Sequence, residues 1–145
     1  MRRFEFRLQR VMQWQQRLCK IEEDKLRGCL AEVAETENKL ARLMAERVAI
    51  EEEFAVRSAV APADLQALAT FRRKTVADQH ALDQERQSRQ AALDSQRQRL
   101  LAERRRLQVI EKLRARALEE YTRAADRELE SLGLESYLST WNARV

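Results

Sequence analysis

Glycine, proline and aromatic residues are scarce in this chain. Its 145 residues include two Gly and one Pro, and aromatic residues make up 6% of the total. Globular chains ordinarily contain several times more Gly and Pro. Charged residues reach 36%, and the most frequent residue types are Ala, Glu, Arg, Leu and Gln. This composition predicts long helices that bury a stripe of side chains, and it argues against a compact globular core.

Groups that perform chemistry are equally few. The single histidine, His80, lies in a charged stretch, where a surface role is the usual one. The carboxylate runs 22–24 and 51–53 point in different directions around a helix, so they form no acid–base pair. The sequence contains no Gly-rich phosphate loop, no HExxH and no GxSxG. We therefore predict no enzyme activity, no catalytic residues, no cofactor, no metal and no small-molecule substrate.

The cysteines and the apolar runs point to the cytosol. Cys19 and Cys29 are ten residues apart, about 15 Å along a helix, which is too far for a disulfide. No CxxC pair suggests a zinc site. Residues 1–7 are basic without an apolar stretch behind them, so they do not form a secretory signal. No apolar run approaches the roughly 18–20 residues that a membrane span needs.

A coiled-coil pattern runs from about residue 4 to 57. Apolar residues recur there at alternating steps of three and four, as a helix–helix seam requires. Polar residues interrupt this seam at Gln15, Glu22, Thr36 and Arg47. Two consecutive four-residue steps around Glu22 predict a stutter, which would locally unwind the supercoil. The predicted apolar seam is Leu8, Val11, Leu18, Leu26, Cys29, Val33, Leu40, Leu43, Ile50 and Phe54.

A break at residues 58–64 separates this helix from a second one. Pro62 cannot continue a helix, and Asp64 is a suitable N-cap for the next one. The second helix is predicted over about 65–132. Two long amphipathic helices joined by a short loop indicate an all-α, antiparallel coiled-coil hairpin. We interpret residues 1–145 as a single coiled-coil domain.

The second helix has a thinner seam and a defined end. Gly133 is a good residue for stopping it. The tail, 133–145, carries Tyr137, Leu138 and Trp141 at helical spacing, which indicates a possible short C-terminal helix. The predicted seam is Leu65, Leu68, Leu82, Leu93, Leu100, Leu107, Ile110, Tyr121, Leu129 and Leu132.

The placement of charge supports an antiparallel pairing. Residues 1–20 carry six positive charges and one negative charge, residues 22–53 carry five and ten, and residues 69–100 carry seven and four. Folding back near Pro62 sets the acidic segment beside the basic one and leaves the end with the termini basic. The polar interruptions of the seam should keep the hairpin monomeric.

A basic cluster at 104–106 raises the alternative of nucleic-acid binding, since the sequence pI is about 9.4. A basic zipper would place such a cluster directly before a parallel coiled coil. Here Glu103 and Glu111 flank it inside the second helix, and no aromatic residues are interleaved for base stacking. The alternatives that stay open are a generic coiled-coil scaffold and a basic, nucleic-acid-binding helical protein.

Two stretches resemble the FliJ family of flagellar export proteins. Residues 4–12, Phe-Glu-Phe-Arg-Leu-Gln-Arg-Val-Met, are similar to the opening of that family. Residues 106–121 are similar to its run of arginines followed by EKL, basic residues and EEY. Residues 126–130 resemble the family's final segment less closely, and the tail from Tyr137 to Trp141 departs from the family's pattern.

The resemblance implies a stalk of the type III export apparatus. FliJ-like hairpins bind the hexameric export ATPase with the end that carries both termini, promote its assembly and activity, reach the membrane export gate, and escort export chaperones. A stalk of the related injectisome is the nearest alternative. The place implied is the cytoplasmic face of the inner membrane, with membrane association only through partners.

Particular residues follow for each contact. The apolar ring candidates have a second interpretation, in which they only close the end of the hairpin. Candidates for the ATPase ring are Phe4, Phe6, Leu8, Arg10, Val11, Lys112, Arg116 and Tyr121, and candidates for the export gate are Leu68, Phe71 and Val76.

Overall fold

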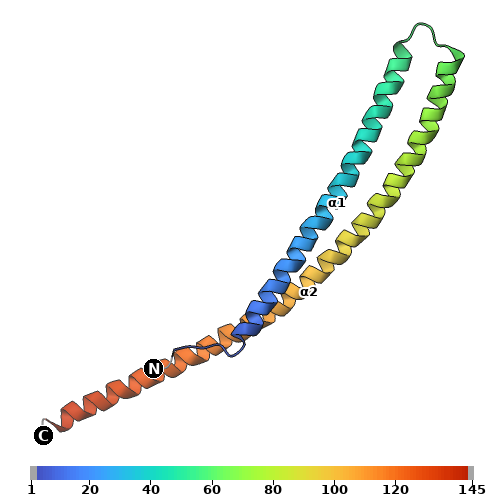
Figure 1. Ribbon diagram of the computed structural model, residues 1–145. Coiled ribbons are helices and arrows are strands. Elements are labelled where there is room, and N and C mark those ends of the chain that lie inside the picture. The colour runs from blue at the N-terminus through green and yellow to red at the C-terminus, as the bar shows by residue number, and fades with distance from the viewer. Residues whose placement is uncertain (1–2, 144–145) are drawn as a thin grey trace. The chain divides into compact units, whose positions relative to one another are not determined.

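Two long helices and one short loop make up the protein, as a computed structural model describes it for residues 3–143 (Figure 1). Helix α1 spans Gln9–Val56, and helix α2 spans Pro62–Asn142. The two helices contact each other, and the described residues include no strand. The predicted all-α hairpin is therefore confirmed.

The contacts of the chain group into two compact units. The loop unit consists of Ile21–Leu100, and it contains the turn between the helices. The terminal unit consists of Met1–Lys20 together with Leu101–Val145. Each unit thus combines a part of α1 with a part of α2, and each is described below by itself.

The loop is shorter than the sequence predicted, because α2 already begins at Pro62. The Ala61 carbonyl accepts the Asp64 and Leu65 backbone N–H groups at 3.0 and 3.2 Å, which opens the first turn. Proline suits this position, since its φ is helical and the N–H that it lacks would have no helical partner. Asp64 therefore lies inside the first turn, and its prediction as the N-cap is wrong. Its carboxylate lies 3.7 Å from Arg57 across the loop.

Helix α1 begins at Gln9, five residues later than predicted. Residues 3–6 have no regular structure, and a turn at residues 7–8 leads into the helix. From Phe4 to Leu8, half-buried and exposed side chains alternate. This period of two belongs to extended chain. A helix would turn Phe4 and Phe6 to different sides, so burying both aromatic rings favours the extended form.

Gly133 does not end α2, and the predicted stop there is wrong. The helix continues without a break to Asn142, so residues 134–142 extend α2 and do not form a separate short helix. A helix-ending glycine adopts positive φ, and no described glycine does so. A glycine inside a helix costs only about 1 kcal/mol, which the following turns offset. The last two residues of the predicted tail lie outside the described residues.

The seam of α1 alternates steps of three and four from end to end, so the predicted stutter is wrong. The sequence pattern favoured Val11 and Leu18, but Met12 and Cys19 are the buried residues. Burial depends on a residue's angular position around the helix, and polar residues occupy the seam positions at which no apolar residue is available. The buried and half-buried seam is Met12, Gln15, Cys19, Glu22, Leu26, Cys29, Val33, Thr36, Leu40, Leu43, Arg47, Ile50 and Phe54.

In α2, three leucines predicted for the seam are exposed. Leu65, Leu129 and Leu132 have 55 to 60% of their surface accessible. The seam of α2 instead takes in polar and small residues, and its buried and half-buried members include Thr75, Gln79, Arg89, Gln96, Glu103, Ala117 and Ala125. Apolar identity alone was therefore a poor guide to burial on this helix.

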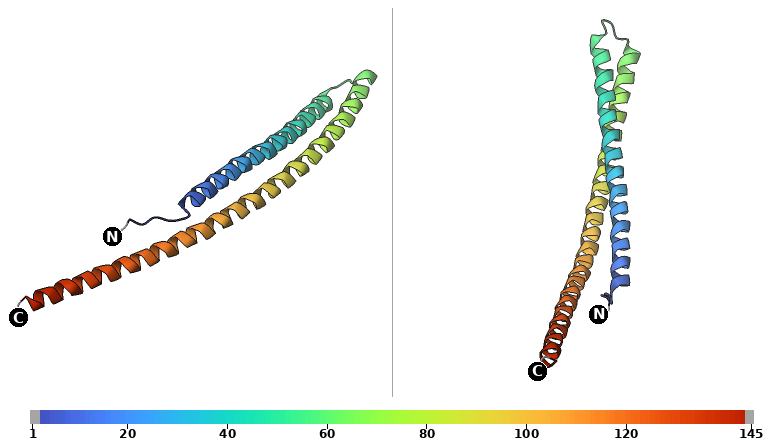
Figure 2. Two further views of the ribbon diagram at one scale, coloured as in Figure 1. Left: turned by 60° about the horizontal axis from the view of Figure 1, so that its bottom comes forward. Right: turned by 90° about the vertical axis from the view of Figure 1, so that its left-hand side faces the viewer.

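In the loop unit, the acidic part of α1 lies beside the basic part of α2 (Figure 2). Arg89 lies 3.3 Å from Glu32, and Arg72 lies 3.3 Å from Glu51. Partner numbers rise on one helix as they fall on the other, so the pairing is antiparallel and matches the predicted charge pattern. Each exposed pair contributes no more than about 1 kcal/mol. They favour the register without supplying most of the stability.

Buried glutamines connect the helices in both units. In the terminal unit, the Gln15 amide donates hydrogen bonds to the Glu103 carboxylate and, at 3.1 Å, to the Glu103 carbonyl. In the loop unit, Gln96 makes the same two bonds to Glu22, with 3.1 Å to the carbonyl. We call these contacts the Gln–Glu clamps. In each, a glutamine from one helix holds both the backbone and the side chain of a glutamate from the other.

The clamps make the helix pairing specific. A shift of one helix along the other would bury a glutamine amide without its glutamate, and an unsatisfied buried amide costs roughly 1–3 kcal/mol. No buried side-chain N or O of the described residues lacks a hydrogen-bond partner. Polar residues in a coiled-coil seam generally reduce stability while fixing register and oligomeric state.

Replacing all four clamp residues by leucine should therefore stabilise the chain and broaden its association. For Gln15→Leu/Glu22→Leu/Gln96→Leu/Glu103→Leu we expect unfolding to require more denaturant, by roughly 1–3 kcal/mol, and dimers or larger species to appear. Urea unfolding and analytical ultracentrifugation measure the two effects. The control Gln13→Leu/Glu35→Leu/Gln87→Leu/Glu111→Leu makes the same changes at exposed positions. A four-leucine clamp variant that stays a monomer would contradict this role.

The clamp in the loop unit should also give a pH dependence. Hydrogen bonds from Lys25 and Gln96, with the charges of Lys25 and Arg99, lower the pKa of Glu22 below its ordinary 4.5, against the opposing effect of burial. The ionised form is thus favoured by folding. Its contribution is present above pH 4.5 and is lost as the pH falls through the lowered folded pKa.

We expect the difference in stability between the wild type and Glu22→Gln to shrink as the pH falls from neutral to below the lowered pKa of Glu22. Thermal unfolding at a series of pH values measures it. Glu52→Gln, at an exposed position of α1, is the matched control. A difference that stays constant across this range would exclude Glu22 as a source of acid sensitivity.

Candidate partner-binding site

An aromatic contact closes the terminal unit. The ring centroid of Phe4, in the extended segment, lies 5.4 Å from that of Tyr121 on α2, with 55° between the ring planes. This tilted arrangement is one that aromatic pairs prefer. Phe6 and Leu8, which follow Phe4 in the sequence, are also half-buried. The Phe4–Tyr121 contact thus holds the N-terminal segment against α2.

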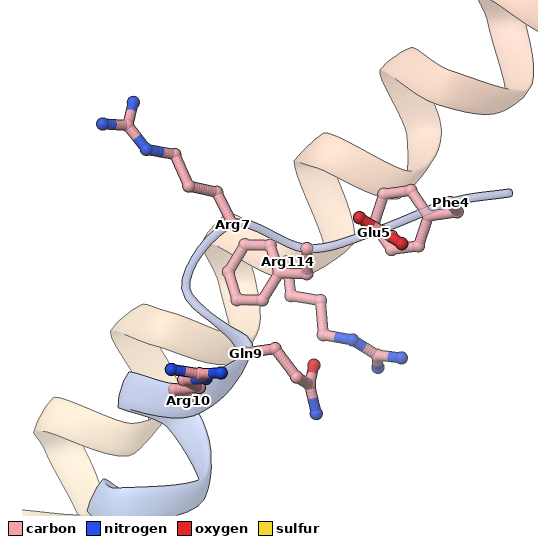
Figure 3. Close-up of a pocket in the computed structure, with 7 residues that line it drawn as sticks. Phe4, Glu5, Arg7, Gln9, Arg10 and Arg114 are labelled. Carbon is pink, nitrogen blue, oxygen red and sulfur yellow. The ribbon is translucent and has the colours of Figure 1, made fainter. Parts of the chain in front are cut away.

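An open hollow of about 710 Å³ lies next to this contact (Figure 3). Both the extended segment and α2 contribute to it, and the Arg7 and Arg114 side chains extend in different directions around it. Three of its residues are arginines and one is a glutamate, so its surroundings are basic. Its lining is Phe4, Glu5, Phe6, Arg7, Gln9, Arg10 and Arg114.

Other predicted ring residues face solvent. Arg10, Lys112 and Arg116 are exposed, and Val11 keeps 44% of its surface accessible. Lys112 and Arg116 are four residues apart on α2, so they project from one side of the helix. The structure therefore divides the eight candidates into four that are half-buried and four that are exposed.

Charge is concentrated in one part of the terminal unit. Residues 1–20 carry six basic and one acidic residue, and residues 101–118 carry six basic and two acidic ones. We call this part the basic end. An excess of positive charge of this size attracts an acidic surface over several ångströms and increases the rate of encounter. The basic end is suited to bind a partner, with apolar side chains at its centre.

The residues predicted for the export gate are not presented together. Leu68 and Phe71 are half-buried in the seam of the loop unit. The Phe71 carbonyl also accepts the hydroxyl of the buried Thr75 at 2.9 Å. Val76, with 59% of its surface accessible, is the one of the three that a partner can reach fully.

Sequence reasoning missed Arg114 as part of the candidate site. Its position was informative, since it follows the seam residue Ile110 by four and precedes the seam residue Ala117 by three. This position around the helix places Arg114 on the side of α2 that faces the N-terminal segment, whereas Lys112 and Arg116 lie on other sides. A second hollow, of about 480 Å³ in the loop unit, was also missed; its lining is Lys39, Arg42, Leu43, Glu46, Asp78, Ala81 and Leu82.

Within residues 3–143, neither helix includes a segment apolar enough, over a sufficient length, to cross a bilayer. Within the same range, no group of three or more His, Cys, Asp or Glu side chains is arranged to hold a metal ion.

Comparison of the chain with protein-family models, with curated proteins and with solved structures finds no match.

The aromatic contact should contribute to the stability of the terminal unit. A double-mutant cycle on Phe4→Leu and Tyr121→Leu should give a coupling of about 0.5–1.5 kcal/mol, measured by urea unfolding. The matched cycle on Phe4→Leu and Trp141→Leu should give none, because residue 141 makes its ring contact with Tyr137. Equal coupling in both cycles would show that the Phe4–Tyr121 contact is not specific.

Proposed function

We propose that this chain is the stalk of a flagellar type III export ATPase, and that its basic end binds the ATPase ring. The observation that carries the proposal is the composition of this end, where Arg10, Val11, Lys112 and Arg116 are exposed and Phe4 holds the N-terminal segment against Tyr121. These residues belong to the two stretches that resemble the FliJ family. A helical hairpin is also the fold that this resemblance implies.

The physical argument is one of complementarity. Long-range electrostatic attraction can draw a hairpin toward a ring before short-range contacts form. The basic end carries twelve basic and three acidic residues, counting those of 1–20 and 101–118. An acidic ring lining would therefore attract this end first. The exposed Val11 and the half-buried Phe6 would then add short-range apolar contacts.

The resemblance also supplies further partners for the same proposal. In it, the loop unit contacts the membrane export gate near Val76, and the chain escorts export chaperones. The chain would then work at the cytoplasmic face of the inner membrane, attached only through these partners. An injectisome ATPase is the alternative ring, and both rings belong in the test.

The test compares charge reversals at two places. The variant Arg10→Glu/Lys112→Glu/Arg116→Glu reverses the basic end. The control Arg42→Glu/Arg73→Glu/Lys74→Glu makes the same change in net charge at exposed positions of the loop unit. We expect the wild type and the control to bind a purified flagellar export ATPase and stimulate its hydrolysis. The basic-end variant should bind roughly 10–100-fold more weakly.

The other outcomes separate the competing functions. Binding to an injectisome ATPase alone would move the stalk to that system. No binding to either ATPase by a folded, monomeric chain would reject the stalk. Steeply salt-dependent binding to a random DNA duplex would then favour a nucleic-acid-binding protein, and a stable dimer without DNA binding would favour a scaffold.

A further inference from the structure

Four large apolar side chains are presented together on the last turns of α2. Leu134, Tyr137, Leu138 and Trp141 follow the spacing i, i+3, i+4, i+7, which places them on one face of the helix. Between 59 and 64% of each residue's surface is accessible. The Tyr137 and Trp141 rings lie 6.2 Å apart, so the two aromatic residues form one continuous patch. We call these four residues the apolar stripe.

The stripe is not a continuation of the hairpin seam. The seam of α2 passes through Tyr121 and Ala125, and Leu129 and Leu132 follow Ala125 by four and seven residues. Leu132 and Leu134 are about 200° apart around the helix, so the stripe lies on roughly the opposite side from the seam. All described residues from 126 to 142 are exposed, so packing within the hairpin does not account for the apolar residues of the stripe.

The charge around the stripe is the reverse of that at the basic end. From Glu128 to Asn142 the helix carries three carboxylates, those of Glu128, Glu130 and Glu135, and no Lys or Arg. Two stripes packed face to face in parallel would set Glu130 and Glu135 against the same residues of the other copy, which disfavours a second copy in that arrangement. An anionic lipid surface would repel the same residues. A partner with basic residues beside an apolar groove fits both features.

We propose that Leu134, Tyr137, Leu138 and Trp141 form a helical docking motif for a protein whose apolar groove is bordered by Lys or Arg. The spacing i, i+3, i+4, i+7 is the one by which amphipathic helices insert into such grooves. Trp and Tyr are the residues that most often dominate binding energy. The motif is already helical, which reduces the ordering cost of binding. It lies outside the basic end, so the proposal goes beyond the stalk and does not depend on it.

The experiment uses the full chain and a defined probe. The probe is a synthetic amphipathic peptide of Leu and Lys with heptad-spaced leucines; the controls are a scrambled peptide of the same composition and a Leu/Glu peptide of the same pattern. In a Trp14→Phe background, Trp141 is the only tryptophan left and reports burial of the stripe by a blue shift of its emission. We expect a blue shift with the patterned Leu/Lys peptide and none with either control.

Two matched variants locate the binding. Leu134→Ala/Leu138→Ala should weaken the peptide about tenfold or more, as loss of central apolar anchors does. Leu65→Ala/Leu132→Ala removes equally exposed leucines outside the stripe on α2 and should leave the affinity unchanged. Calorimetric titration measures both.

The proposal is overturned by equal binding of the two variants, or by a Trp141 shift that the scrambled or Leu/Glu peptide also produces. It is likewise overturned if phosphatidylglycerol vesicles, or self-association of the chain alone, bury Trp141 in place of the Leu/Lys peptide. None of these outcomes involves the ATPase, so failure here is distinct from failure of the stalk.

Discussion

The pairing of α1 with α2 along one narrow seam is the interaction on which everything else depends. Among the described residues, five apolar side chains and four polar ones are buried. A core with so few apolar side chains cannot select one alignment by packing alone. The Gln15–Glu103 and Gln96–Glu22 clamps supply that selection, because each is satisfied in only one register. The protein thus gives up part of its attainable stability for a defined helix pairing.

This narrow core leaves most side chains for the surface, where charge divides the chain into parts with different character. In the loop unit, acidic residues of α1 meet basic residues of α2 across the seam, as Glu32 and Arg89 do. In the terminal unit, basic residues outnumber acidic ones over residues 1–20 and 101–118. The last turns of α2 are acidic and carry the apolar stripe. A partner's charge therefore determines which part of the molecule it approaches.

The extended N-terminal segment has a particular role in this arrangement. Phe4 holds it against Tyr121 of α2, and Arg7 contributes to the hollow beside Arg114. A helical segment at this place would bury only one of the two rings. The same aromatic contact therefore favours the extended conformation of this segment and brings its Arg7 to the hollow that Arg114 also lines.

The sequence by itself determined the helical class, the hairpin turn near Pro62, the polar seam positions and the acidic-against-basic pairing, because periodicity and charge are local properties of a helix. The tertiary structure decided the phase of the seam near Met12 and Cys19, the extended form of residues 3–6 and the continuation of α2 past Gly133. In each case the local sequence is compatible with two conformations. Burial against α2 determines which residues of α1 form the seam and favours the extended form of the N-terminal segment. Past Gly133, unbroken helical hydrogen bonding outweighs one glycine.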